Sequence, residues 1–163
     1  MPRSEDDQIP YFLEVFERLQ PKTVLDIGAG EGKYADLIAR RAKVHAIEIW
    51  AQNVENYDLP SKYDEVFVWD ARKHENFDYD LVIFGDVLEH MSQDDAVALW
   101  NKARTQAKAI FMSIPIVHLP QGAEGGNPYE VHVVDDYDHE RIMQTFDDIK
   151  EFRLYNRIAA YLA

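Results

Sequence analysis

The stretch Val24–Lys33, VLDIGAGEGK, places three glycines at every second position directly behind a short apolar run. Residues 23–27 have the composition of a buried strand, and a helical pattern follows from about residue 31 to residue 41. Glycines at a strand-to-helix turn permit positive φ angles and remove the Cβ atoms that would keep a ligand away from the backbone. The stretch therefore predicts a turn at which the backbone closely approaches a bound ligand.

The spacing of these glycines argues against a phosphate-binding turn. A dinucleotide fold requires G-x-G-x-x-G, but counting from Gly28 the third glycine position is occupied by Lys33. The G-K-[ST] ending of a phosphate-binding P-loop is also absent. Asp26, two residues before the first glycine, suits a ligand that carries a cationic centre or an amine.

The rest of the chain alternates β-branched runs with amphipathic helical patterns, which predicts a doubly wound α/β fold with a mostly parallel sheet. The last two predicted strands are separated by only two residues, so they must be antiparallel, because a parallel crossover needs a dozen residues or more. The predicted strands are residues 23–27, 43–49, 65–69, 79–84, 109–114, 149–154 and 157–162, and the predicted helices are residues 8–19, 31–41, a segment after the capping residue Ser92, and 139–146.

Length and composition indicate one domain, residues 1–163, with an N-terminal helical segment at residues 1–21. The chain has no cysteine, which excludes disulfides and thiolate metal sites. No apolar run is long enough for a membrane span and no signal-peptide pattern is present, so we expect a cytoplasmic protein. A net charge of -13 disfavours stable binding to nucleic acid.

The segment VLDIGAGEG resembles motif I of the class I, Rossmann-like S-adenosylmethionine-dependent methyltransferases. Later segments agree with that family in order and spacing, from about Lys22 to Leu162. The resemblance implies a Rossmann-like sheet whose last strand is antiparallel to its neighbours. It also implies S-adenosylmethionine as the methyl donor and S-adenosylhomocysteine as the product.

The resemblance implies a set of donor-binding residues at the ends of the predicted strands. Glu48, in HAIEIW, would bind the ribose hydroxyls, and a carboxylate is well suited to a diol. Asp70, after the third strand, would hold the adenine amino group, and Asp86 would lie near the methionine part or the acceptor. The expected cofactor-binding residues are Asp26, Gly28, Ala29, Gly30, Glu48, Ile49, Asp70, Ala71 and Asp86.

The run FGDVLEHM, after the fourth predicted strand, carries the candidate catalytic residues. His90 is the first candidate for a general base, with Glu89 and His132 as further candidates; His118 is a fourth titratable group near the same sheet edge. The alternative is structural: Glu89 and His90 would only order the start of the next helix. The long loop at residues 115–138, with aromatic and polar anchors that include Tyr129 and His132, is expected to act as a lid over the acceptor and to supply specificity.

The leading interpretation is a methyltransferase acting on a small-molecule or sugar-like acceptor, with no residue assigned as a metal ligand. Two alternatives remain open. One is a non-catalytic donor-binding domain that serves as a partner or regulator. The other is metal-assisted O-methylation, because Asp86-x-x-Glu89-His90 resembles the E-x-x-E-H metal cluster of ubiquinone-pathway and small-RNA methyltransferases, with His132 available to complete the set.

Overall fold

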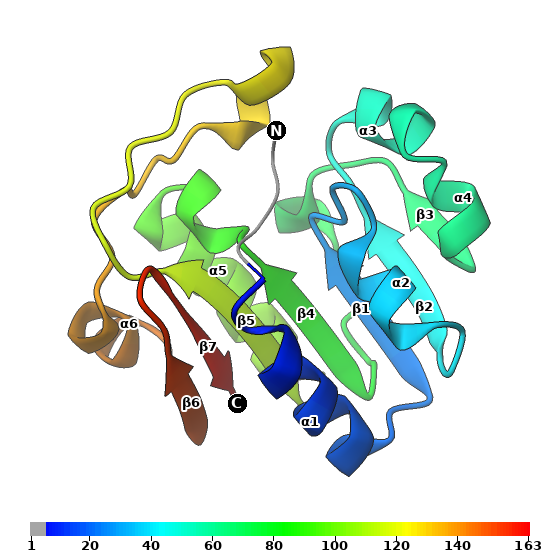
Figure 1. Ribbon diagram of the computed structural model, residues 1–163, viewed down its shortest axis with the longest axis horizontal. Coiled ribbons are helices and arrows are strands. Elements are labelled where there is room, and N and C mark those ends of the chain that lie inside the picture. Colours follow the sequence, from blue (N-terminus) through cyan, green and yellow to red (C-terminus); the bar gives the residue numbers. More distant parts are fainter. Residues whose placement is uncertain (1–5) are drawn as a thin grey trace.

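The computed structural model describes residues 6–163, and within them the chain forms a seven-stranded sheet in the order β3-β2-β1-β4-β5-β7-β6 (Figure 1). The first five strands along the chain are parallel, and β7 is antiparallel to both β5 and β6. The predicted Rossmann-like sheet with an antiparallel C-terminal pair is therefore confirmed. The strands are β1 (Thr23–Ile27), β2 (Lys43–Ile47), β3 (Glu65–Phe67), β4 (Leu81–Gly85), β5 (Ile110–Pro115), β6 (Glu151–Leu154) and β7 (Ile158–Leu162).

Helices cover both faces of this sheet (Figure 1). One face packs against α1, α2 and α4, and the other packs against α5 and the end of α6. The helices of the described chain are α1 (Ile9–Leu19), α2 (Lys33–Ile38), α3 (Ala51–Asn56), α4 (Leu59–Lys62), α5 (Gln93–Arg104) and α6 (His139–Thr145), with short 3-10 turns η1 (Ala71–Lys73), η2 (Leu88–His90), η3 (Glu124–Gly126) and η4 (Pro128–Glu130). None of the helices in this part of the chain has the length and apolarity to cross a bilayer.

The alternation of side chains along each strand separates the two cores. In β4, Val82 and Phe84 face the core under α5, whereas Leu81 and Ile83 face the core under α1 and α2. All four side chains are fully buried, which explains why the strand reads as a continuous apolar run. The helix after Ser92 begins as expected, because the Ser92 hydroxyl accepts from the backbone N–H of Asp95.

The structure differs from the sequence-based expectations mainly between β2 and β3, where it forms the short helices α3 and α4. These helices of six and four residues are too short to show a helical period in the sequence. Helix α2 ends earlier than expected, because Ala39 and Arg40 adopt positive φ angles. Of the segment 1–21, the predicted helix is present as α1, and residues 1–5 lie outside the described residues.

Strands β1 and β4 are neighbours at the centre of the sheet, and the chain builds outward from them in opposite directions. Strands β2 and β3 lie on the far side of β1, whereas β5 lies on the far side of β4. Such a reversal leaves a crevice at the carboxyl ends of the central strands, where open α/β sheets bind their ligands. The topology therefore places a ligand site beside the glycine turn that follows β1.

Gly85, the last residue of β4, packs directly under helix α2. A Cβ atom added at Gly85 would lie 2.3 Å from Cε2 of the Tyr34 ring. That ring is buried, and its hydroxyl hydrogen-bonds the hydroxyl of Ser113 at 3.3 Å, so it has little freedom to move aside. The absence of a side chain at Gly85 is therefore a packing requirement.

The substitution Gly85→Ala is expected to lower the free energy of unfolding by about 1–3 kcal/mol, the usual cost of overpacking a core. Gly122→Ala is the control, because a Cβ there would meet no atom within 4 Å; it should change stability by less than about 0.5 kcal/mol. Urea unfolding of both variants measures the difference. Equal stability of the two variants would contradict the packing argument.

Candidate functional site

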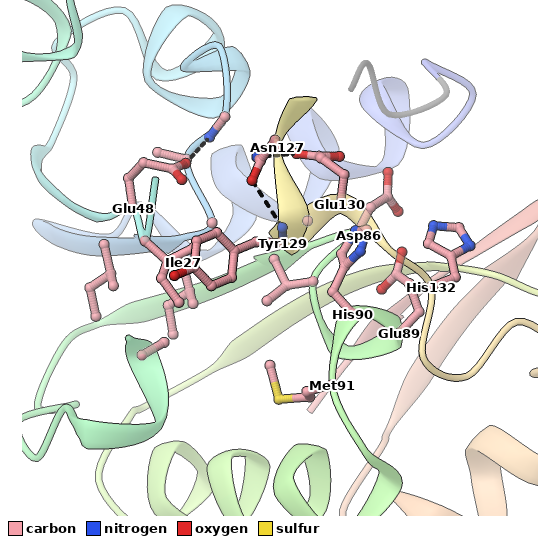
Figure 2. A pocket seen from close by; sticks show the side chains of 18 of the residues that line it. Ile27, Glu48, Asp86, Glu89, His90, Met91, Asn127, Tyr129, Glu130 and His132 are labelled. Atoms are coloured by element: carbon pink, nitrogen blue, oxygen red, sulfur yellow. Dashed lines mark hydrogen bonds between the residues drawn. The ribbon is translucent and has the colours of Figure 1, made fainter. Parts of the chain in front are cut away.

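A cavity of about 340 Å³ lies at the carboxyl ends of β1, β2, β4 and β5, within the size range of small-molecule sites (Figure 2). One side is formed by the glycine turn after β1 and the residues that follow β2 and β3. The other side is formed by η2 and by part of the loop at residues 115–138. Lining residues that the sequence had singled out are Gly28, Ala29, Gly30, Glu48, Ile49, Asp70, Ala71, Asp86, Glu89, His90, Tyr129 and His132.

The glycine turn presents bare backbone to this cavity. Gly28 and Gly30 have φ angles of 69° and 52°, which favour glycine. A Cβ at Gly28 would lie 2.6 Å from a methyl carbon of Val87, whereas a Cβ at Gly30 would meet nothing closer than 3.9 Å. The first glycine thus allows close packing against the segment after β4, and the second leaves open space toward the cavity.

Glu48 connects the glycine turn to the end of β2. One carboxylate oxygen accepts from the backbone N–H of Gly30 and the other from that of Trp50, each at 2.9 Å. Burial raises the pKa of Glu48, and these backbone donors oppose that effect. Each oxygen retains a lone pair for a ligand hydroxyl.

Asp70 lines the cavity, but its carboxylate is also held by Arg72. The Arg72 guanidinium donates to both oxygens of Asp70 at 2.6–3.0 Å, and this interaction lowers the pKa of Asp70. Next to it, the Trp69 ring lines the cavity and stacks on Phe67 with centroids 5.0 Å apart. Neither Arg72 nor Trp69 was singled out from the sequence, because each follows the third strand without a motif of its own.

Asp26 lies outside the set of cavity-lining residues, in contrast to the expectation that it contacts a ligand. Its side chain is 1% exposed and accepts a hydrogen bond from the Tyr63 hydroxyl at 2.5 Å. Burial raises its pKa to about 7, the Tyr63 hydrogen bond opposes the rise, and the charge of Glu48 adds to it. Asp26 therefore links β1 to Tyr63, the residue that follows α4, within the core.

Asp86 follows β4 and has a φ angle of 54°, a left-handed conformation that is uncommon for a residue other than glycine. The Ser113 hydroxyl donates to the Asp86 carboxylate at 3.3 Å and lies 3.3 Å from the Tyr34 hydroxyl. Side chains from α2, β4 and β5 thus share one hydrogen-bonded chain. This chain orients the Asp86 carboxylate at the cavity wall.

The three predicted catalytic residues, Glu89, His90 and His132, lie together on one side of the cavity (Figure 2). One ligand atom of each lies within 4.8 Å of those of the other two. The Nδ1 atom of His90 lies within hydrogen-bonding distance of the carbonyl oxygen of Val131, 41 residues away in the sequence. The Nδ1 atom of His132 lies within hydrogen-bonding distance of the carbonyl oxygen of Leu119, 13 residues away. Carbonyl oxygens only accept, so each Nδ1 carries the proton and each Nε2 keeps a lone pair.

Burial disfavours the charged forms of Glu89 and His90. Glu89 is 1% exposed, and neither carboxylate oxygen has a hydrogen-bond partner among the described residues. Burial raises its pKa well above the usual range, and the charge of Asp86 adds to the effect. Burial also lowers the pKa of His90 to about 4, with a further contribution from His132. At neutral pH His90 is therefore neutral, and burial favours the protonated form of Glu89.

The loop contributes more to the cavity than the sequence indicated. Gln121, Asn127 and Glu130 line it in addition to the expected Tyr129 and His132. Polar residues in an irregular loop have no periodic pattern that would mark which of them face inward. The candidate His118, in contrast, is exposed, lies 3.7 Å from the Asp135 carboxylate and is not among the lining residues.

The buried Asp26 predicts a specific pH dependence of stability. Its folded pKa of about 7 exceeds the ordinary value of 3.8, so the folded protein binds a proton that the unfolded chain releases between these pH values. Stability contributed by Asp26 is thus present below about pH 4 and lost as the pH rises to about 7, with a slope of up to about 1.4 kcal/mol per pH unit. Asp26→Asn should remove this slope.

Chemical denaturation from pH 4 to pH 8 tests this expectation. The free energy of unfolding of Asp26→Asn, measured relative to that of the wild type, should be higher at pH 8 than at pH 4. The exposed Asp78→Asn serves as the control and should keep the wild-type dependence. A pH dependence in Asp26→Asn that matches the wild type would show that Asp26 is ionised in the folded protein.

Fold and cavity together define a Rossmann-like α/β protein that binds a small ligand at the central crevice of its sheet. A family model described as a methyltransferase domain matches residues 3–109 of the sequence, and the chain belongs to this family. No curated protein gives a significant match to the sequence.

Solved structures share the fold at low sequence identity. A S-adenosylmethionine-dependent methyltransferase from Clostridium acetobutylicum ATCC 824 has a TM-score of 0.74 and 12% identity over 94% of this chain and 88% of its own. Magnesium protoporphyrin IX methyltransferase from Synechocystis PCC 6803, with bound S-adenosylhomocysteine, has a TM-score of 0.69 and 17% identity over 96% and 80% of the two chains.

A third structure, from Nostoc punctiforme PCC 73102, has a TM-score of 0.66 and 16% identity over 94% of this chain. The present chain spans only 55% of that protein's length. The chain therefore belongs to a methyltransferase-domain family and shares its fold with S-adenosylmethionine-dependent methyltransferases.

Proposed function

We propose that the protein transfers a methyl group from S-adenosylmethionine to a small-molecule or sugar-like acceptor inside this cavity. The observation that carries the proposal is the arrangement of one cavity with two chemically different ends (Figure 2). The glycine turn and Glu48 form the end suited to the donor. Glu89, His90 and His132 form the end suited to proton transfer from an acceptor. The Synechocystis neighbour, by its name, methylates a small molecule, which supports the same class of acceptor.

The donor end fits S-adenosylmethionine in shape and in hydrogen bonding. The space left by Gly30 admits a ligand against the backbone, and the free lone pairs of Glu48 suit the two ribose hydroxyls. Asp70 would share its carboxylate between Arg72 and the adenine amino group. The bound donor would supply an electrophilic methyl group on its sulfonium. The residues proposed to hold it are Gly28, Ala29, Gly30, Glu48, Ile49, Asp70, Ala71 and Asp86.

The acceptor end supplies alignment and a proton acceptor. Methyl transfer is an in-line displacement, so the first requirement is to hold the two reactants in register. The neutral imidazole of His90 offers Nε2 to the proton of a hydroxyl or amine, and His132 lies beside it with ring centroids 4.9 Å apart. Burial favours the protonated form of Glu89, which could donate a hydrogen bond within the same cluster.

The cluster also favours an enzyme over a non-catalytic donor-binding domain. A buried carboxyl group without hydrogen-bond partners costs stability, so Glu89 is expected to persist only where a bound molecule requires it. The loop at residues 115–138 is proposed as the lid, because its residues line the cavity while its tip at residues 122–126 is exposed.

Donor binding is tested by calorimetric titration with S-adenosylmethionine and S-adenosylhomocysteine. The wild type is expected to bind both, and Glu48→Ala should weaken both by at least about ten-fold, because the ribose hydroxyls lose a charged acceptor. Glu55→Ala, at an exposed position of α3, is the matched control and should bind as the wild type does. Wild-type protein that binds neither ligand would refute the proposed function.

A second candidate function, metal-assisted methylation, is favoured by the geometry of the same cluster. Glu89, His90 and His132 could offer one carboxylate oxygen and two imidazole nitrogens to a single ion. Asp86, the first residue of the E-x-x-E-H-like run, is not part of this group, so His132 would replace it. Two imidazole ligands favour zinc, manganese or iron over magnesium, and such an ion would polarise or orient an acceptor hydroxyl.

Titration with Mn²⁺, Zn²⁺ and Mg²⁺ distinguishes this candidate from metal-free catalysis. If the cluster is a metal site, the wild type binds Mn²⁺ or Zn²⁺ more tightly than Mg²⁺, and His132→Ala and Glu89→Gln each weaken binding by about 10–100-fold. His118→Ala is the control, since this histidine lies outside the cavity. Methylation that is unchanged by chelator and by added metal would exclude the metal-assisted route.

A further inference from the structure

A strap, defined as residues 119–134 of the loop, is hydrogen-bonded to Glu89 at its base and exposed at its tip. The backbone N–H groups of Val133 and Val134 both donate to the backbone carbonyl of Glu89, at 2.9 and 3.1 Å. At the tip, Cβ atoms added to Gly125 or Gly126 would meet nothing within 4 Å. The strap is therefore joined directly to the catalytic cluster, while residues 122–126 in its outer part are exposed.

Glu130 is the carboxylate that the strap presents to the cavity. The Asn127 side chain donates to one of its carboxylate oxygens at 3.2 Å, and the Gln121 side chain donates to its backbone carbonyl at 2.8 Å. Asn127 is itself buried and accepts from the backbone N–H of Tyr129 at 3.0 Å. These contacts hold the Glu130 side chain in a defined direction.

Glu130 lies between the two ends of the cavity. It interacts electrostatically with Glu48 at the donor end and with Glu89 at the acceptor end. Figure 2 shows the same order, with Glu130 between Glu48 on one side and Glu89 and His132 on the other. A methyl group that passes from donor to acceptor must cross this middle region.

The middle of the cavity is suited to a positive charge. Asp86 and Glu130 line it, and the charge of each raises the cost of ionising the neighbouring Glu89. Glu89 in addition is fully buried with both oxygens lacking a partner among the described residues. A cationic ligand would relieve the mutual repulsion, and a neutral ligand would not.

We propose that Glu130 is the residue by which the strap distinguishes the charged methyl donor from its neutral product. The inference rests on the proposed function. Loss of the methyl group leaves the electron pair of the broken carbon–sulfur bond on sulfur, so the sulfonium becomes an uncharged thioether. Attraction between Glu130 and the charged sulfur is present before transfer and absent after it, which favours a closed strap with the donor and release of the product.

Calorimetry at pH 8 with both ligands tests this proposal through the ratio of the two dissociation constants. Glu130→Gln keeps the shape of the side chain and removes its charge, so it should reduce the preference for S-adenosylmethionine over S-adenosylhomocysteine by about ten-fold. Glu130→Asp keeps the charge and should retain most of the preference. Glu140→Gln, at an exposed position of α6 outside the cavity lining, is the matched control and should leave the ratio unchanged.

The outcomes separate this inference from the proposed function. Failure of the wild type to bind either ligand would refute the proposed function. If the wild type binds both ligands and Glu130→Gln leaves the ratio of the two dissociation constants unchanged, the role of Glu130 alone is overturned. Hydrogen–deuterium exchange of the wild type gives a test independent of variant stability: S-adenosylmethionine should protect residues 119–134 more than S-adenosylhomocysteine does, and equal protection would also overturn it.

Discussion

The hydrogen bonds of Glu48 are the interaction on which the site depends most. Its carboxylate accepts from the backbone of Gly30 after β1 and of Trp50 after β2, and so adds to the backbone hydrogen bonds that Gly28 and Ala29 donate to Ile47. The glycines of the first turn have positive φ angles and no side chains of their own to hold them in place. A single buried carboxylate thus helps to fix the turn and leaves lone pairs facing the cavity.

The proposed donor end of the cavity is held by these hydrogen bonds, whereas the proposed acceptor end lowers the stability of the fold. Glu89 is buried without a partner among the described residues, and burial keeps His90 neutral. The strap of residues 119–134 is bonded to Glu89 through its backbone carbonyl, so the part of the chain that covers the cavity is also the part that contacts the catalytic cluster. In the proposed function, binding, proton transfer and closure are coupled through the hydrogen bonds between Glu89 and the strap.

Much of the fold could be predicted because its signals are local. The central strand β4 is a continuous apolar run, and the two residues between the last two predicted strands require an antiparallel pair; β6 and β7 are in fact three residues apart. The site residues after β1, β2 and β4 could be anticipated because parallel strands bring their carboxyl ends to one edge. Helices α3 and α4 could not, since four to six residues carry no helical period. Asp26 could not be placed either, because the sequence does not show its hydrogen bond to Tyr63.

The sequence by itself determined the sheet, the glycine turn and the resemblance to a methyltransferase, because these depend on spacing along a continuous stretch. Only the tertiary structure decided which polar groups share the cavity. It joined Glu89 and His90 to His132, which lies 42 residues beyond His90 in the sequence, and brought Arg72 onto Asp70. It also directed Glu130 inward and left His118 outside. The physical reason is that an irregular loop has no periodicity, so the direction of each side chain is set by its contacts after folding.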